Sequence, residues 1–169
     1  MNIFSFFKKL RDEEVSRKID FLQQNKLFDK IPRRKMLHVL ETLHEKSYVK
    51  GETIFTEGEI GRALFLVVSG RIDLYKNMPD GTQVKVASIN PGEFFGEMAL
   101  IEERPRTTTA IVGEDAKMFL LFKIKLDALL YARPEIGVII STRLAKIIST
   151  RLRETLAKTE QLVRKDDGK

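Results

Sequence analysis

FGEMALIEERPRTTTA, the stretch from Phe95 to Ala110, carries the strongest structural signal in the chain. A Gly-Glu pair follows two aromatic residues, an apolar run and a charged turn come next, and Pro105 closes the turn. The three threonines after Arg106 are β-branched and are typical of a strand. The pattern predicts a short helical turn held between two strands.

The chemistry of this stretch indicates a binding pocket. Gly96 lets a ligand approach the backbone closely, and the first N–H groups of the helical turn point toward an anion. Arg106 adds a planar cation that can bind a phosphate through two parallel hydrogen bonds. Glu97 supplies only acceptors, which suit sugar hydroxyls. These residue types predict a site for one anion and one diol.

The stretch resembles the phosphate-binding cassette of cyclic-nucleotide-binding domains, the family of catabolite activator protein, cyclic-nucleotide-dependent kinases and cyclic-nucleotide-gated channels. The matching segments are Phe95 to Leu100 and Pro105 to Thr108. The resemblance implies that Glu97 binds the ribose 2′-hydroxyl and Arg106 the cyclic phosphate. It extends from about Phe28 to the C-terminal helix. The cassette residues that it assigns to the ligand site are Gly96, Glu97, Met98, Ala99, Arg106, Thr107 and Thr108.

Residues outside the cassette complete the implied site. Val86 and Ala87, on the preceding predicted strand, resemble family positions that line the pocket. Arg151 falls where the family places a side chain that contacts the base. Threonine at position 107 is common in members that respond to cGMP and occurs in some that respond to cAMP. We expect cAMP or cGMP as ligand and no further cofactor, with a slight preference for cAMP because no second residue that reads guanine is evident in the sequence.

The chain around the cassette divides into helical and β-rich parts. From Ser47 to Phe122, short runs of strand-forming residues alternate with glycine-bearing turns, such as those at Gly70 and Gly113, which favours a small barrel or jelly roll. We predict an α+β fold in which about eight short antiparallel strands form a β jelly-roll barrel, with N-terminal helices and a C-terminal helix pair. The predicted segments are 1–45 (N-terminal helices), 46–123 (the barrel, with the cassette at 95–110) and 124–169 (lid and dimerisation helices).

Two amphipathic patterns precede the barrel. Apolar residues in the first dozen positions predict a small helix, and Asp12 to Glu14 predict the acidic first turn of a second one, with Val15, Ile19 and Leu22 inward. A further helix is predicted with Met36, Leu37, Leu40 and Leu43 inward. Residues 1–11 could touch a membrane surface, but we favour packing within the protein or its dimer, because one short helix gives only marginal membrane affinity.

After the barrel, a short helix with Leu126, Leu129 and Leu130 is predicted to end at Arg133-Pro134, and Glu135 to open a long one. The resemblance implies that this last helix caps the base and forms a homodimer seam. The seam positions follow spacings of three and four residues: Ala145, Ile148, Leu152, Thr155, Thr159 and Leu162.

Composition excludes several other classes of protein. The net charge of +6 comes from basic residues scattered among acids, so it does not indicate a nucleic-acid surface. The absence of cysteine and of any long apolar run favours a cytoplasmic protein. Both histidines precede the barrel, which leaves no metal site or catalytic triad in the strands, and we expect no enzymatic activity.

Two functional hypotheses remain. The first is a stand-alone cyclic-nucleotide sensor of bacterial type that signals through its last helix to an unknown effector protein. We expect no DNA binding, because the chain ends where related regulators place a helix-turn-helix domain. The alternative is a ligand-independent dimerisation or interaction module on the same fold, against which the intact glycine, glutamate and arginine argue.

Overall fold

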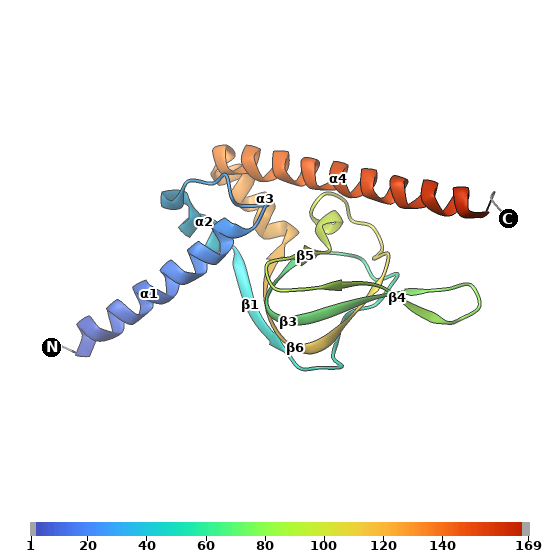
Figure 1. Ribbon diagram of the computed structural model, residues 1–169. Helices are drawn as coiled ribbons and strands as arrows, with labels where there is room; N and C mark the ends of the chain where they lie inside the picture. The colour runs from blue at the N-terminus through green and yellow to red at the C-terminus, as the bar shows by residue number, and fades with distance from the viewer. Residues whose placement is uncertain (1–2, 167–169) are drawn as a thin grey trace.

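A computed structural model of the chain describes the backbone of residues 3–166 and the side chains of residues 10–157 and 160. A curled antiparallel sheet forms the body, and helices cover one end of it (Figure 1). In chain order the elements are α1 (Ile3–Gln24), the 3-10 helix η1 (Arg33–Lys35), α2 (Met36–Leu40), β1 (Leu43–Tyr48), β2 (Thr53–Phe55), β3 (Ala63–Asn77), β4 (Gln83–Ile89), β5 (Phe94–Phe95), the 3-10 helix η2 (Glu97–Leu100), β6 (Thr109–Phe122), α3 (Lys123–Ala132) and α4 (Pro134–Asp166).

The sheet confirms the predicted jelly-roll fold, with fewer and longer strands than expected. Its order is β1-β6-β3-β4, β2 pairs with β6, and β5 pairs with β3. The sheet has six strands within the described residues and does not close into a barrel, whereas about eight short strands were predicted. The long strands β3 and β6 pair from Ala63 opposite Phe122 to Tyr75 opposite Thr109 and carry most of the architecture.

The predicted number of strands was too high because two glycines were assigned to turns between strands. Gly70 lies inside β3 and Gly113 inside β6, and the pairing continues past both with shifts of register between Val67 and Ile72. Gly70 has a positive φ of 80°, and a Cβ there would lie 2.2 Å from the Asp115 carbonyl oxygen. Glycine therefore marks a bulge that bends a continuous strand.

Both faces of the long strands are buried, in two separate cores. In β3, Leu64 and Leu66 pack into the cluster that contains the helices, whereas Phe65 and Val67 pack inside the curled sheet. The end of β6 alternates in the same way. Because successive side chains of a strand point to opposite faces, an uninterrupted apolar run is what a strand covered on both sides requires.

The N-terminal helices differ from the prediction. α1 runs without a break through Asp12 to Glu14, so these acids lie inside one long helix instead of opening a second one. No proline or glycine interrupts this region, and glutamate is a good helix former. Val15, Ile19 and Leu22 pack against or within the core as expected.

The prediction for α2 was only partly right. Met36 is buried and Leu40 packs against the core, but Leu37 is exposed and Val39 takes the second buried position in the helix. The helix ends at Leu40, so Leu43 belongs to β1. A short helix followed at once by a strand cannot keep the long inward stripe that the spacing suggested.

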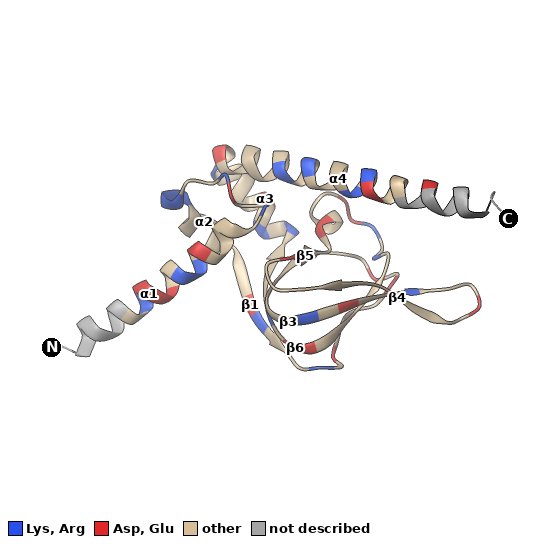
Figure 2. Ribbon diagram, viewed as in Figure 1, with Lys and Arg blue, Asp and Glu red and all other residues tan. Residues whose placement is uncertain are grey.

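The predicted C-terminal helix pair is confirmed as α3 and α4, with Arg133 between them. Ile136, Ile140 and Leu144 seat the start of α4 in the core, and the helix then runs across the top of the sheet, above β5 and the cassette (Figure 1). Lys and Arg are interspersed with Asp and Glu along both α1 and α4 (Figure 2).

Contact of residues 1–11 with a membrane surface stays a prediction, because the side chains of residues 1–9 lie outside those that the structure describes. Within the described part of the chain, no helix is long and apolar enough to cross a membrane.

Candidate functional site

The cassette connects β5 to β6 through η2 and an irregular loop. Gly96 precedes η2 with a left-handed backbone, φ 74°, which reverses the chain directly after Phe95. A Cβ at this glycine would lie 2.6 Å from Nη1 of Arg106. The loop is fixed at its far end, where Arg106 N donates to the Glu59 carbonyl (2.7 Å) and Ile60 bridges to Pro105. The sequence therefore folds the helical turn and the arginine back against each other.

Arg106 lies partly buried at the centre of the cassette. Its Nη2 donates to the carbonyl oxygen of Ala63 at 2.8 Å, and its Nη1 donates to that of Gly96 at 3.2 Å. Both acceptors are neutral, and no carboxylate among the described side chains forms an ion pair with the guanidinium. Its orientation is fixed without its positive charge being neutralised, which is the arrangement expected of an anion-binding arginine.

An aromatic platform supports this guanidinium. The Arg106 Cζ lies 4.2 Å from the centroid of the Phe55 ring and 5.6 Å from that of Phe65. Phe55 and Phe65 form a cluster with Phe95, and the rings of Phe65 and Phe95 stack at 5.1 Å. A cation over an aromatic face gains about 0.5–2 kcal/mol, depending on desolvation. Phe55 could not be found from its local sequence, because the pairing of β2 with β6 brings it beneath the arginine.

Burial lowers the pKa of the Arg106 guanidinium from its ordinary value, and the negative charges of Glu59 and Glu97 act in the opposite direction. A bound anion would act in the same direction as these carboxylates and would favour the charged form.

Glu97 is buried, with 7% of the residue exposed, and it forms an ion pair that the sequence analysis did not anticipate. Its Oε1 lies 2.6 Å from Nη1 of Arg151, on α4. Arg151 also donates from Nη2 to the Phe94 carbonyl at 3.0 Å, and its guanidinium lies 5.2 Å from the centre of the Phe94 ring. The long helix is thus bonded to the cassette through the glutamate that was assigned to the ribose.

These residues surround a cavity of about 570 Å³. The structure brings all but one of the predicted site residues to its wall: Ala87, Gly96, Glu97, Met98, Ala99, Arg106, Thr107, Thr108 and Arg151. Val86 is the exception, since it is 54% exposed and does not line the cavity. Leu74 pairs with Ala87 and Tyr75 with Lys85, so Val86 is the extra residue of a bulge and Ala87 alone faces inward.

The cavity also has walls that the sequence analysis did not predict. Leu74, Ile89 and Phe95 give it an apolar side, and Glu154 and Thr155 extend it along α4. Position 154 lies three residues after Arg151, so one turn of the helix places both at the cavity. The combination of a fixed cation, a buried carboxylate and an apolar wall can hold an anionic sugar that carries a flat, mostly apolar group.

Both histidines, His38 on α2 and His44 on β1, are absent from the lining of this cavity. Within the described residues, no group of three or more histidine, aspartate or glutamate side chains has the arrangement of a metal site.

Comparison with known proteins places this fold and cassette in a family. Residues 45–132 match the model of the cyclic nucleotide-binding domain, which covers more than half of the chain. The chain therefore belongs to the cyclic nucleotide-binding domain family, and the relatives it matches include a cyclic AMP receptor protein, a cAMP-dependent protein kinase regulatory subunit of Aspergillus niger and a cyclic nucleotide-gated potassium channel of Rhizobium etli, which are not enzymes.

Three relatives illustrate the extent of the similarity. The cyclic AMP receptor protein of Thermus thermophilus is 35% identical over 115 residues, which are 68% of this chain and 51% of the relative. The crystal structure of the catabolite activator protein of the same organism has a TM-score of 0.74 at 31% identity, covering 82% of this chain and 63% of that one. The N-terminal domain of a transcriptional regulator from Streptomyces coelicolor has a TM-score of 0.71 at 30% identity, covering 80% and 94%. The chain spans about half the length of the first curated relatives it matches.

Proposed function

We propose that this protein is a sensor of cAMP or cGMP that binds the nucleotide in the cassette cavity. The main support is the environment of Arg106, which is fixed by neutral carbonyls and an aromatic ring and has no ion-pair partner among the described side chains. Arg106 lines the same cavity as the buried Glu97. In this proposal the phosphate binds Arg106 and the amides at the start of η2, and the ribose 2′-hydroxyl donates to Glu97.

The base would lie toward α4, where the cavity is bounded by Arg151 and by the apolar side chains of Leu74 and Ile89. Arg151 could stack on a purine or donate a hydrogen bond to it. Thr107, at the cavity wall, could accept from the guanine 2-amino group. A second guanine-reading residue was not evident in the sequence, and one relative is named a cyclic AMP receptor protein, so cAMP is the favoured ligand.

The proposed output is movement of α4, sensed by a separate effector protein. Glu97 belongs to the ligand site and also holds Arg151 of α4, so a ribose hydroxyl at Glu97 acts directly on the contact between helix and cassette. A ligand can shift α4 only as far as its affinities for the two helix positions differ. Exchange of the α4 amides with and without nucleotide measures that shift.

The alternative is an interaction module that needs no ligand. The described part of the predicted homodimer seam consists of Ala145, Ile148, Leu152 and Thr155, of which Leu152 is 59% exposed. Leu156, outside the predicted seam, is also exposed on α4, at 54%. Thr159 and Leu162 have side chains outside those that the structure describes. Sedimentation equilibrium of the wild type and of Leu152→Glu tests the seam, whether or not nucleotide binds.

Calorimetric titration of the purified protein with cAMP, cGMP and 5′-AMP separates the two functions. The sensor binds at least one cyclic nucleotide saturably and more tightly than 5′-AMP. The interaction module binds none of them yet still forms a dimer. Mass spectrometry of small molecules released from the purified protein identifies a ligand that is carried through purification.

A further inference from the structure

The long helix α4 is attached to the rest of the molecule in two different ways. Its first turns are packed by Ile136, Ile140 and Leu144, which lie in the helical core. Further along, Ile147 is only partly buried and Leu152 is exposed. Beyond Leu144 the described helix is therefore held over the cassette mainly by polar side chains, with Ile147 as a partly buried apolar contact.

Two arginines join α4 to neighbouring segments, Arg151 in this later part and Arg143 beside the buried Leu144. Arg151 bonds to Glu97 and to the Phe94 carbonyl, as described above. Arg143 lies eight positions earlier, about 12 Å along the helix axis at ~1.5 Å per residue. It forms a two-pronged ion pair with Asp29, in which Nε donates to Oδ1 at 2.8 Å and Nη2 contacts both carboxylate oxygens. The side chains are 21% and 30% exposed, so the pair is mostly shielded from water.

Asp29 belongs to a tight turn after α1 that is itself anchored to the cassette side of the sheet. The backbone N–H groups of Phe28 and Asp29 both donate to the Asn25 carbonyl at 2.9 Å. The buried Asn25 side chain accepts from Leu27 N at 2.9 Å and donates from Nδ2 to the Gly92 carbonyl at 2.8 Å. Gly92 lies in the turn that leads into β5 and the cassette. Residues 25–29 therefore connect Gly92 to α4.

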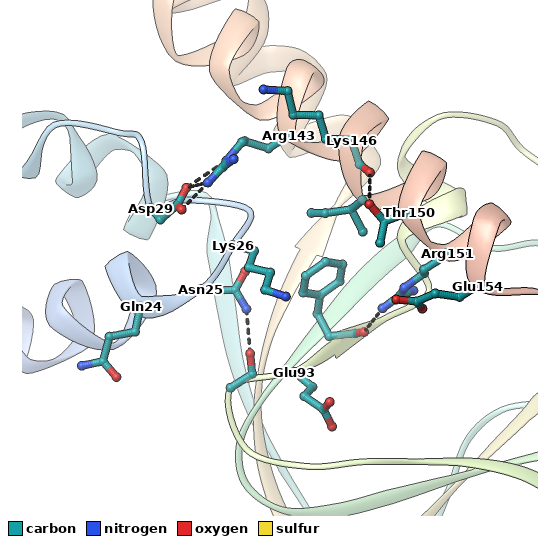
Figure 3. Close-up of a pocket in the computed structure, with 13 residues that line it drawn as sticks. Gln24, Asn25, Lys26, Asp29, Glu93, Arg143, Lys146, Thr150, Arg151 and Glu154 are labelled. Carbon is teal, nitrogen blue, oxygen red and sulfur yellow. Dashed lines mark hydrogen bonds and ion pairs between the residues drawn. The ribbon is translucent and has the colours of Figure 1, made fainter.

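The two arginine contacts lie on opposite sides of a second cavity of about 750 Å³ (Figure 3). The cavity separates α4 from Gly92 to Phe94, and it shares Glu93, Arg151 and Glu154 with the cassette cavity. Its remaining charged lining residues balance in number, with Lys26 and Lys146 against Glu93 and Glu154. An open gap without net charge contributes little to the angle of the helix, whereas the ion pairs at its ends hold the helix directly.

We propose that the Asp29–Arg143 pair, held by Asn25, is a positioning contact for the nucleotide site. It acts through α4: it holds the helix at the distance at which Arg151 reaches Glu97 and the cavity wall. This role rests on the proposed cyclic-nucleotide function and extends it to the segment that precedes the sheet. Without the pair, a smaller fraction of molecules has α4 in the position that binds nucleotide. The apparent affinity for nucleotide falls in proportion to that fraction.

The test uses variants that remove the ion pair without touching the nucleotide cavity. Asp29→Asn and Arg143→Gln each remove one charge; the first keeps the side-chain size, and the second leaves a shorter polar side chain. Asp20→Asn is the matched control, because it breaks the exposed Arg33–Asp20 ion pair within the same N-terminal segment. We expect about five-fold or more loss of cAMP or cGMP affinity in the two test variants and less than two-fold in the control. The double variant should lose no more than the stronger single one, since both remove one interaction.

Hydrogen exchange of the ligand-free proteins gives a second readout, which does not depend on nucleotide. Amides of residues 148–157 should exchange faster in Asp29→Asn than in the wild type or in Asp20→Asn, while the strands β3 and β6 stay equally protected. A wild type that binds no cyclic nucleotide overturns the proposed function, and the exchange result then decides the positioning of α4 alone. Unchanged exchange of residues 148–157 in both test variants, or unchanged affinity where the wild type binds, overturns the inference.

Discussion

Replacing Gly96 with alanine tests whether the left-handed, Cβ-free backbone at this position makes room for the Arg106 guanidinium. The φ of Gly96 is 74°, a left-handed conformation that costs a residue with a Cβ about 1–2 kcal/mol. The new Cβ would lie 2.6 Å from Nη1 of Arg106 and 3.2 Å from the Ala63 carbonyl oxygen, so the guanidinium must move. Gly81→Ala is the matched control, because Gly81 has a φ of 82° with nothing within 4 Å of the added Cβ.

The two variants should lose similar stability and differ in ligand affinity. A cost of ~1–2 kcal/mol lowers the melting temperature by roughly 2–8 °C for a domain of this size. Only Gly96→Ala should weaken nucleotide binding. Disturbing a charged hydrogen bond costs ~1.5–3 kcal/mol, which is roughly ten-fold to a hundred-fold in affinity. Thermal unfolding and calorimetric titration provide both numbers. Equal affinities in the two variants would refute the argument that Gly96 makes room for the anion-binding arginine.

Three further outcomes follow from the same structure. A hydrogen bond to a charged carboxylate contributes ~1.5–3 kcal/mol, so 2′-deoxy-cAMP should bind the wild type at least about ten-fold more weakly than cAMP, and Glu97→Gln should narrow that ratio in a competition assay. Thr107→Ala should change the affinities for cAMP and cGMP little; a fall in cGMP affinity alone would show that Thr107 contacts guanine and would count against cAMP as the favoured ligand. Ion pairs with Lys117 and then Lys18 lower the pKa of Glu45, so its stabilising effect is present above the ordinary glutamate pKa and is lost as the pH falls below it. Glu45→Gln should therefore lower the melting temperature at pH 7 and have little effect near pH 3, whereas an equal effect at both would contradict the ion-pair account.

The cassette could be predicted from sequence because its signal is local. Gly96, Glu97 and Arg106 lie within eleven consecutive positions, and their spacing alone defines the turn that joins them. Phe55 could not be found in this way. Its place under the guanidinium depends on the pairing of β2 with β6, where Phe55 lies opposite Ala110. No property of position 55 itself distinguishes it from any other apolar residue in a strand.

Strand ends and long-range ion pairs were the parts that sequence patterns misjudged or missed. Glycine has the same appearance at a turn and at a bulge, so Gly70 divided one strand into two predicted ones. The prediction that Val86 lines the pocket was wrong for a related reason, since a bulge changes which residue faces the cavity. The Asp29–Arg143 pair joins residues 114 positions apart, and only the packing of α4 on the core brings them together.

Titration of Arg106→Ala with cAMP and cGMP is the most direct test of the account. Arg104→Ala is the control, because Arg104 lines the same cavity but is exposed and pairs with Glu102. Removing one partner of a buried charge pair costs ~2–5 kcal/mol, so Arg106→Ala should bind roughly thirty-fold to several-thousand-fold more weakly than the wild type. Arg104→Ala should stay within about three-fold of it. An Arg106→Ala protein that binds both nucleotides as tightly as the Arg104→Ala protein would contradict the assignment of this cavity to a cyclic phosphate.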